Sequence, residues 1–439
     1  IVGNELKAVW HTEKNADGKS VTVVDYKTRD EKVAAAAKAI IDPIDKAYGE
    51  KFAVSKVELN GAKAPNGNRD SETNNGDLIT DAMLWQVKQD ADIKLTVDDD
   101  HIVAITNGGG IRAEIKVGDV TKNDIFTVLP FGNTVDVIYV TGAQLLEVLE
   151  ASTFCLPESI GGFPQVSGIS YTISTAVPYD ANAETYPAST YYGPKTINRV
   201  SINSINGKEF KADDTYAVVT NDFCSTGGDT YYAFKSTAKA DKVATGVTLD
   251  QALMNYVKTE LKGVIGKQYA APQGRILMNP FKDVKVSSWF GKYVIDLYND
   301  GIINGTSATT YAPNDTLTWA AALKLLLVSH GDLKAADATG ADWSKNTIAK
   351  AAELGLVAAD LDGAKAISRL EFCQVAAKLN KLAESKTESK FTDCTDGYVM
   401  ALVDAKVING MTETTFEPSA TLTRAQIAKI IYQLNLIEK

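Results

Sequence analysis

Residues 107–136 read NGGGIRAEIKVGDVTKNDIFTVLPFGNTVD and follow an apolar segment, Ile102–Thr106, that we predict to be a strand. The three glycines at its end permit positive φ and let a ligand approach the backbone closely. Arg112 then supplies a planar guanidinium that suits a phosphate or a carboxylate. Further on, a Pro-Phe-Gly sequence interrupts a helical run and places Phe131 at a loop tip. The stretch predicts a strand that ends in a binding loop.

Four blocks of sequence occur in a fixed order along the chain, with a weaker fifth between the third and the fourth. They are Arg69–Glu72 with Gly76–Ala82, Asn107–Arg112, Leu129–Asn133, the weaker Gln165–Ile169, and Thr220–Phe223 with Gly227–Asp229. Together they resemble the C-terminal, substrate-binding domain of the 5'-nucleotidase family over roughly residues 1–275. The resemblance implies an α/β (α+β) domain of layered sheets and helices over residues 51–278.

The resemblance also implies a site for a nucleotide or nucleoside. In the family, two aromatic rings sandwich the base, and stacking of this kind contributes about 1–3 kcal/mol per base. A phenylalanine more often packs in a core, so the prediction depends on all six positions being filled together. The matching residues are Phe131 and Phe223 for the rings, Asp229 for the ribose hydroxyls, Asn107 near the base, and Arg69 and Arg112 for the phosphate.

Catalysis in this family uses two metal ions, held by Asp, His and Asn residues of an N-terminal domain, which polarise the phosphoryl group and supply a hydroxide. This sequence has three histidines, His11, His101 and His330, and none lies in a DxH, GNH or HxH context. Asp98–His101 reads as a solvated acidic turn. We therefore expect no metal or other cofactor here, a catalytic domain missing from this chain, and no hydrolysis by the chain alone.

The first thirty residues predict a hairpin. Glu5–Trp10 and Ser20–Asp25 read as strands, and Asn15–Gly18 between them is a turn signal. By the resemblance, residues 1–29 are the tail end of a metallophosphatase domain.

A helix is predicted next. Asp30 caps a run from Glu31 to about Tyr48, which Pro43 should kink or interrupt. The resemblance makes residues 30–50 the connecting helix about which the two family domains rotate, and an ordinary surface helix explains the same residues.

Residues 51–278 alternate between helix and strand patterns. Leu78, Ala82 and Trp85 fall on one face of a helix, and Thr141 with Gln144 has the spacing of a capping box that opens another. Residues 177–195 read as a long loop. Strand candidates are Val135–Val140, Ile169–Ile173, Arg199–Ile202 and Tyr216–Val219, but their order in a sheet cannot be read from the sequence.

An internal repeat follows Asn279-Pro280, which we interpret as a short linker. Matching segments lie 105 residues apart, as in Tyr293 and Tyr398, and a degenerate copy lies between them. Short amphipathic helices cannot bury a core alone, so we predict that three repeats pack together as one all-α bundle. The repeats are residues 279–332, 333–385 (the degenerate copy) and 386–439.

These repeats resemble S-layer homology modules, which attach exported bacterial proteins to cell-wall polysaccharide. The family signature appears as Ile367–Glu371 and Leu422–Gln426. Its Ser/Thr-x-x-Glu/Gln part is a capping box, but arginine there costs about 0.3–1 kcal/mol against the helix dipole. We therefore predict that Arg369 and Arg424 bind an acidic wall polysaccharide, although both could simply be solvated at helix starts. The first repeat, with Leu317–Ala321, has lost arginine and capping glutamate, which predicts a weakened groove.

Bulk composition narrows the classes of function. The 439 residues are 45% hydrophobic and 23% charged, an ordinary mixture for a chain of several globular domains. The net charge of −10 argues against a broad nucleic-acid surface, and no apolar run reaches the roughly 18 residues of a membrane span. Residue 1 is Ile without a signal-peptide pattern, so the sequence reads as a processed or truncated product. The cysteines leave buried thiols or one disulfide, such as Cys155–Cys224, as alternatives.

Two functions are consistent with these patterns. The first is the C-terminal part of a cell-wall-anchored bacterial 5'-nucleotidase, extracellular on the cell surface, whose partners are a nucleotide, wall polysaccharide and a separate catalytic domain. The second is a structural surface-layer protein in which the nucleotidase-like domain is an assembly unit that contacts identical subunits.

Overall fold

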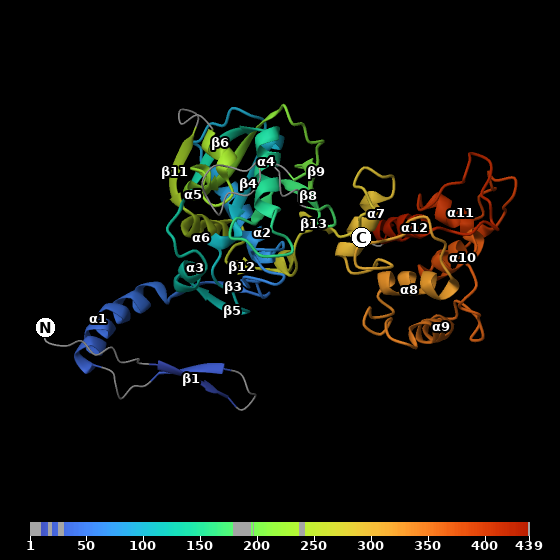
Figure 1. Cartoon of the computed structure of the whole chain (residues 1–439), viewed down its shortest axis with the longest axis horizontal. Helices are drawn as coiled ribbons and strands as arrows, with labels where there is room; N and C mark the ends of the chain where they lie inside the picture. The colour runs from blue at the N-terminus through green and yellow to red at the C-terminus, as the bar shows by residue number, and fades with distance from the viewer. Residues whose placement is uncertain are drawn as a thin grey trace.

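The computed structural model describes residues 10–15, 20–24, 30–178, 195, 197–236 and 242–437. Figure 1 shows two bodies and an N-terminal extension that projects from the first of them. We call residues 51–279 the α/β domain and residues 280–437 the repeat region. The α/β domain lies between the extension and the repeat region.

A mixed five-stranded sheet forms the middle of the α/β domain. Only β4 and β10 run parallel among its neighbouring pairs. All six residues of β4 are buried, with Ile102 and Ala104 in one core and Val103 and Ile105 in another, so the sheet is covered on both faces. The strand order is β11 (Val243–Thr248), β6 (Thr134–Thr141), β10 (Thr215–Asn221), β4 (Ile102–Asn107) and β7 (Pro164–Ser167).

Helices and a smaller sheet cover each face of this central sheet. On one face lie α2 (Asn74–Gln89), α3 (Lys122–Val128), α6 (Leu249–Thr259) and the sheet β12 (Val264–Ile265), β3 (Lys51–Ser55), β5 (Gly118–Thr121). On the other lie α4 (Gly142–Thr153) and the sheet β13 (Ile276–Asn279), β8 (Ile169–Ser174), β9 (Val200–Ile205). The predicted mixture of layered sheets and helices is therefore confirmed.

Most local predictions in this domain agree with the structure. Leu78 and Ala82 are fully buried on α2, and Thr141 with Gln144 forms the predicted capping box of α4. One strand is shifted: β9 begins at Val200, because Arg199 turns inward and donates hydrogen bonds to four carbonyls around its guanidinium. Most of the predicted loop at 177–195 lies outside the described residues.

The N-terminal extension holds a hairpin and one long helix. β1 (Trp10–Lys14) pairs antiparallel with β2 (Ser20–Val24), while most of the predicted strand Glu5–Trp10 lies outside the described residues. Asp30 caps α1 (Glu31–Tyr48) through its carboxylate, as predicted. The helix is continuous through Pro43, so the predicted interruption is wrong; the carbonyl that Pro43 leaves without an N–H donor belongs to Ala39, an exposed residue.

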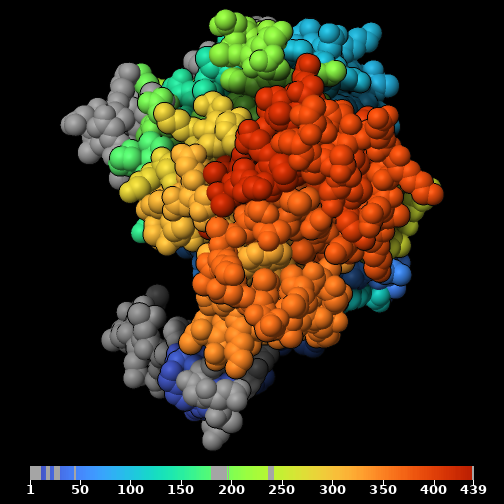
Figure 2. Space-filling view, turned by 90° about the vertical axis from the view of Figure 1, so that its right-hand side faces the viewer, coloured from blue at the N-terminus to red at the C-terminus, as the bar shows by residue number. Residues whose placement is uncertain are grey.

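The repeat region is a ring of three similar units around one hydrophobic core. Antiparallel bridges join Thr318 to Ala366 and Ser368 to Thr421, and the bridge from Thr423 back to Thr316 closes the ring. Seen end on, residues of the last repeat in red lie against those of the first in yellow (Figure 2). The helices of the repeat region are α7 (Gly291–Asn299), α8 (Trp319–His330), α9 (Trp343–Glu353), α10 (Arg369–Leu379), α11 (Gly397–Asp404) and α12 (Arg424–Ile437).

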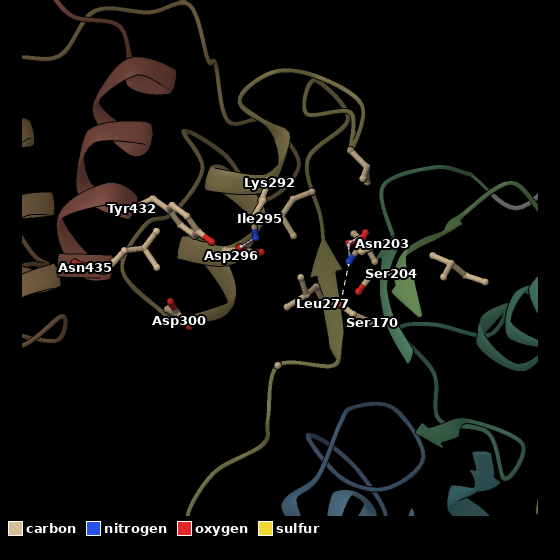
Figure 3. A pocket seen from close by; sticks show the side chains of 15 residues that line it. Ser170, Asn203, Ser204, Leu277, Lys292, Ile295, Asp296, Asp300, Tyr432 and Asn435 are labelled. Atoms are coloured by element: carbon tan, nitrogen blue, oxygen red, sulfur yellow. Dashed lines mark hydrogen bonds and ion pairs between the residues drawn. The ribbon is translucent and has the colours of Figure 1, made fainter. Parts of the chain in front are cut away.

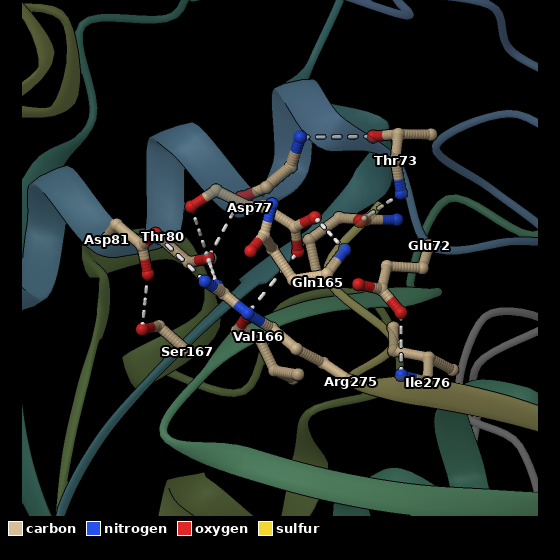
Figure 4. Close-up of polar contacts among 12 residues, drawn as sticks. Glu72, Thr73, Asp77, Thr80, Asp81, Gln165, Val166, Ser167, Arg275 and Ile276 are labelled. Atoms are coloured by element: carbon tan, nitrogen blue, oxygen red, sulfur yellow. Dashed lines mark hydrogen bonds and ion pairs between the residues drawn. The ribbon is translucent and has the colours of Figure 1, made fainter. Parts of the chain in front are cut away.

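The junction between the two bodies is a fixed joint, which corrects the interpretation of Asn279-Pro280 as a linker. Asn279 is 1% exposed, and its amide donates to the Val284 carbonyl at 2.7 Å. Just upstream, Arg275 pairs with Asp81 at 2.8 Å and lies 3.6 Å from Asp77 (Figure 4). A buried network therefore holds β13 against α2.

Burial, and then the neighbouring Glu72 carboxylate, raise the pKa of Asp77 to about 8, although Arg275 opposes the shift.

The four cysteines are free thiols, so the alternative of a Cys155–Cys224 disulfide is not realised.

Candidate functional site

The candidate site lies at one edge of the central sheet, where β4 and β10 end side by side. These strands are parallel, with Ala104 opposite Val219, so the loops that follow them meet at the same edge. After β4 comes the turn Gly108–Gly110, and after β10 comes the short helix α5 (Asp222–Ser225). Sequence reasoning identified both loops, and the parallel pairing brings them together.

A cavity of about 690 Å³ lies elsewhere, at the junction with the repeat region, whereas the cavity at this edge measures about 660 Å³. All six residues predicted from the family resemblance line the second one: Arg69, Asn107, Arg112, Phe131, Phe223 and Asp229. Sequence reasoning did not assign Asn133 or the loop Ser159–Gly161, which also line it. Gly161 and Gly162 were the available signal, since neighbouring glycines before a strand indicate close backbone approach.

Two aromatic rings at the cavity are unusually accessible. Phe131 is 61% exposed and Phe223 is 43% exposed, so neither ring packs in the core. Gly228 supports Phe223, because a Cβ at this position would lie 2.6 Å from the ring. An exposed ring that packs closely against the backbone at Gly228 offers an apolar face to a flat ligand.

A chain of amides fixes the carboxylate of Asp229. The Asn221 amide donates to Asn107 Oδ1 at 3.0 Å, and Asn107 Nδ2 donates to Asp229 Oδ2 at 2.8 Å. Asn107 is 6% exposed and uses both ends of its amide inside the protein. Burial raises the pKa of Asp229, while the Asn107 hydrogen bond and Arg69 oppose the shift. Asn107 thus orients an acceptor that faces the cavity.

Two arginines give the cavity its positive charge. Burial first, and then the nearby Arg112, lower the pKa of Arg69, which reports like charges brought close together. Arg112 is exposed, donates to the Gly109 carbonyl at 3.2 Å and lies 5.7 Å from the centre of the Phe131 ring. Paired guanidiniums beside an accessible cavity are suited to an anion such as phosphate.

Buried scaffolding holds these loops in register. Gln165, in the weakest of the five sequence blocks, is fully buried, and its amide donates to the Asn68 and Ser71 carbonyls that flank Arg69. Gly108 has no room for a side chain, because a Cβ would lie 1.6 Å from the Asn68 carbonyl oxygen. The block that contains Gln165 therefore holds the loop that carries Arg69 in place.

The predicted wall-binding arginines have a different environment. Arg369 donates to the Asn409 carbonyl at 2.7 Å and stacks on Phe416 at 4.7 Å, and both partners belong to the next repeat. Arg424 donates to Tyr311 and Asn304 carbonyls at 2.7 and 2.8 Å and thereby joins the third repeat to the first. Both arginines hold neighbouring repeats together.

A small pocket of about 160 Å³ nevertheless opens beside Arg369. Arg369 is 7% exposed, and its Nε atom is buried without a hydrogen-bond partner. Trp289, which is 58% exposed, and Lys429 also line the pocket. In the first repeat, Thr318 caps α8 without a reciprocal acidic partner, as predicted from the lost motif.

The residues present do not fit the two-metal centre of the nucleotidases. Within the described part of the chain, no group of three or more His, Cys, Asp or Glu side chains could hold a metal ion. His101 lies between Asp100 and Asp214, at 2.6 and 3.3 Å, where the Asp100 hydrogen bond raises the pKa of the imidazole.

Family models place known domains on both bodies. Residues 51–236 match the 5'-nucleotidase C-terminal domain. The chain contains this domain, followed by S-layer homology domains. The S-layer homology model matches residues 280–322 and 393–428, which fall in the first and third predicted repeats, while no match covers the second. Such domains indicate association with the cell surface, and none of the described helices has the length and apolarity of a membrane span.

Individual relatives cover the first body. The chain is 38% identical over 187 residues to the trifunctional nucleotide phosphoesterase protein YfkN of Bacillus subtilis, covering 42% of this chain and 11% of the relative. It is 30% identical over 198 residues to the cell wall protein Lmo0130 of Listeria monocytogenes, covering 44% and 22%. A crystal structure of the 5'-nucleotidase precursor from Thermus thermophilus shares 29% identity, with a TM-score of 0.45 over 61% of this chain and 48% of that chain. The chain thus spans less than half the length of these proteins.

Proposed function

We propose that this chain is the substrate-recognition and anchoring part of a bacterial cell-surface 5'-nucleotidase. The α/β domain binds a nucleotide or nucleoside, and the repeat region attaches it to wall polysaccharide. The observation that carries the proposal is the convergence of Phe131, Phe223, Asp229 and two arginines on one cavity, from loops far apart in the sequence.

Each group in the cavity suits one part of a nucleotide. The exposed rings of Phe131 and Phe223 offer stacking surfaces for a base. The oriented Asp229 carboxylate accepts hydrogen bonds from ribose hydroxyls, and Arg69 with Arg112 binds the phosphate. Asn107, which was predicted to lie near the base, lines the cavity and also positions Asp229.

Attachment depends on the pocket beside Arg369. The exposed Trp289 ring and the cationic side chains of Arg369 and Lys429 that line this pocket together suit an acidic sugar, whose ring stacks and whose anion pairs. Because Arg369 also ties two repeats together, its replacement would disturb the fold as well as binding. Trp289 is therefore the better residue to change.

Two exposed aromatic residues provide reciprocal tests. Phe223→Ala should weaken adenosine and AMP binding about tenfold or more in calorimetry, since stacking contributes about 1–3 kcal/mol, while sedimentation with purified cell-wall sacculi stays unchanged. Trp289→Ala should leave nucleotide binding intact and shift the protein to the supernatant.

Wild-type affinity for adenosine in Phe223→Ala would reject the base site, and full pelleting of Trp289→Ala would reject the anchoring pocket. If both proteins behave as wild type, the structural surface-layer alternative is favoured. An assay with AMP and excess Mn²⁺ or Zn²⁺ tests the expectation that this chain alone does not turn over substrate.

A further inference from the structure

A large cleft lies between the two bodies and is separate from both sites above. Its volume is about 690 Å³. Figure 3 shows one wall formed by β8, β9 and β13 of the α/β domain and the other by α7 and α12 of the repeat region. We call it the interdomain cleft.

The walls of the interdomain cleft are held at a fixed separation, because β13 belongs to both bodies. Ile276 packs in the core of the α/β domain, whereas its neighbour Leu277 packs against the core of the repeat region. The Asn299 side chain on α7 hydrogen-bonds both the N–H and the carbonyl of Met278 at 2.9 Å. A shared strand clamped in this way gives the cleft a defined shape.

Hydroxyl and amide groups dominate the α/β wall. Ser170 and Thr172 are two residues apart on β8, so both side chains stand on the same face of the sheet. The Asn203 amide donates to Thr172 Oγ1 at 3.0 Å and to Ser170 Oγ at 3.5 Å.

The opposite wall supplies an aromatic ring and balanced charges. Lys292 pairs with Asp296 at 2.7 Å and lies 5.0 Å from the centre of the Tyr432 ring. Tyr293 packs on the same ring at 5.2 Å and fixes its orientation. With Asp300, the charged groups lining the cleft sum to −1, so an anion is disfavoured here. The Arg369 pocket, with Arg369 and Lys429, has the opposite sign.

We propose that the interdomain cleft binds an uncharged, hydroxyl-rich sugar segment, which makes it a second glycan site. A sugar ring has an apolar face for Tyr432 and hydroxyl groups for the Asn203 amide, the Ser170 hydroxyl and the carboxylates of Asp296 and Asp300. The inference rests on the proposed wall attachment and deepens it: acidic sugars go to the Arg369 pocket and neutral sugars to the cleft.

The test measures calorimetric binding of an N-acetylglucosamine tetrasaccharide, with a hyaluronan tetrasaccharide as the acidic counterpart. In Trp289→Ala, in which the Arg369 pocket is impaired, the neutral sugar should bind more tightly than the acidic one. Asn203→Ala, at an exposed position, should weaken neutral binding about fivefold or more, as expected when a hydrogen bond to the ligand is lost. Tyr432→Ala should do the same if its circular dichroism is native. Asn123→Ala, an exposed amide on α3, is the matched control.

The cleft and the wall anchor can fail independently. Trp289→Ala should keep wild-type affinity for the neutral tetrasaccharide even while it loses sacculus binding. Absence of tetrasaccharide binding, a preference of Trp289→Ala for the acidic sugar, or equal affinity of wild type and Asn203→Ala for the neutral sugar would overturn the cleft proposal. Full pelleting of Trp289→Ala together with weakened tetrasaccharide binding by Asn203→Ala would overturn the anchoring pocket and support the cleft.

Discussion

The two bodies use arginine in opposite ways. Arg69 and Arg112 stand at an accessible cavity beside two exposed phenylalanine rings. Arg369 and Arg424 direct their guanidiniums at backbone carbonyls and aromatic rings of the neighbouring repeat. An arginine in a family motif therefore does not by itself indicate a ligand contact. Its local environment decides whether it binds or supports, and substitutions at Arg369 and Arg69 test that difference.

The largest expected effect is on stability, from Arg369→Ala. The substitution removes a charged hydrogen bond and a stacked side chain from a buried position, so we expect a loss of about 2–4 kcal/mol in the free energy of unfolding of the repeat region. Urea unfolding followed by circular dichroism measures it. Arg112→Ala, at an exposed arginine, should change stability by less than about 0.5 kcal/mol. Equal losses of stability in the two variants would show that Arg369 and Arg112 do not differ in structural role.

The next effect concerns ligand charge. Arg69→Gln should weaken AMP binding by about tenfold or more, because a hydrogen bond to a charged group contributes about 1.5–3 kcal/mol. Adenosine, which lacks the phosphate, should bind the variant as it binds the wild type. Calorimetry with both ligands separates the two cases. A parallel loss for adenosine would show that Arg69 shapes the cavity instead of binding phosphate.

A third substitution tests the buried network that joins Arg275 to α2. Because the pKa of Asp77 is raised in the folded protein, protonation of its carboxyl group stabilises the fold. This stabilisation is complete below about pH 4, the pKa of an Asp side chain in the unfolded chain, and is lost as the pH rises towards about 8. Between pH 6.5 and 7.5 the titration of Asp77 should lower the free energy of unfolding of the wild type by up to about 1.4 kcal/mol. Asp77→Asn should remove that slope, measured by hydrogen exchange of α2 across a urea series.

The control for this slope is Asp98→Asn, at an exposed position before β4, which should keep the pH dependence of the wild type. A variant Asp77→Asn that keeps the full slope would assign the titration to another group of the network.

The smallest expected effect comes from Gly228→Ala. Its new Cβ would lie 2.6 Å from the Phe223 ring and displace it, so adenosine should bind about fivefold more weakly, a loss of about 1 kcal/mol of stacking. Gly207→Ala, at a glycine with open space around it and, unlike Gly228, a positive φ, controls for backbone strain outside the cavity. Unchanged affinity in Gly228→Ala would show that the ring does not need this support.

Local signals in the sequence determined much of this protein. Capping residues such as Asp30 and Thr141 and the buried strand Ile102–Thr106 depend on interactions within a few residues, so they can be read in order along the chain. The repeats can be read because matching segments recur 105 residues apart. The six cavity residues were predictable because family blocks mark them, although their meeting at one edge required the parallel pairing of β4 with β10.

Tertiary structure decided what depends on distant neighbours. The sequence could not show that Asn107 orients Asp229, that Arg369 and Arg424 contact the carbonyls of the next repeat, or that Asn279 is buried in a fixed joint. Each of these roles depends on which backbone atoms lie within about 3 Å after folding, and the residue type alone does not specify them. The interdomain cleft belongs to the same class, because its two walls come from segments up to about 260 residues apart and meet only through the strand they share.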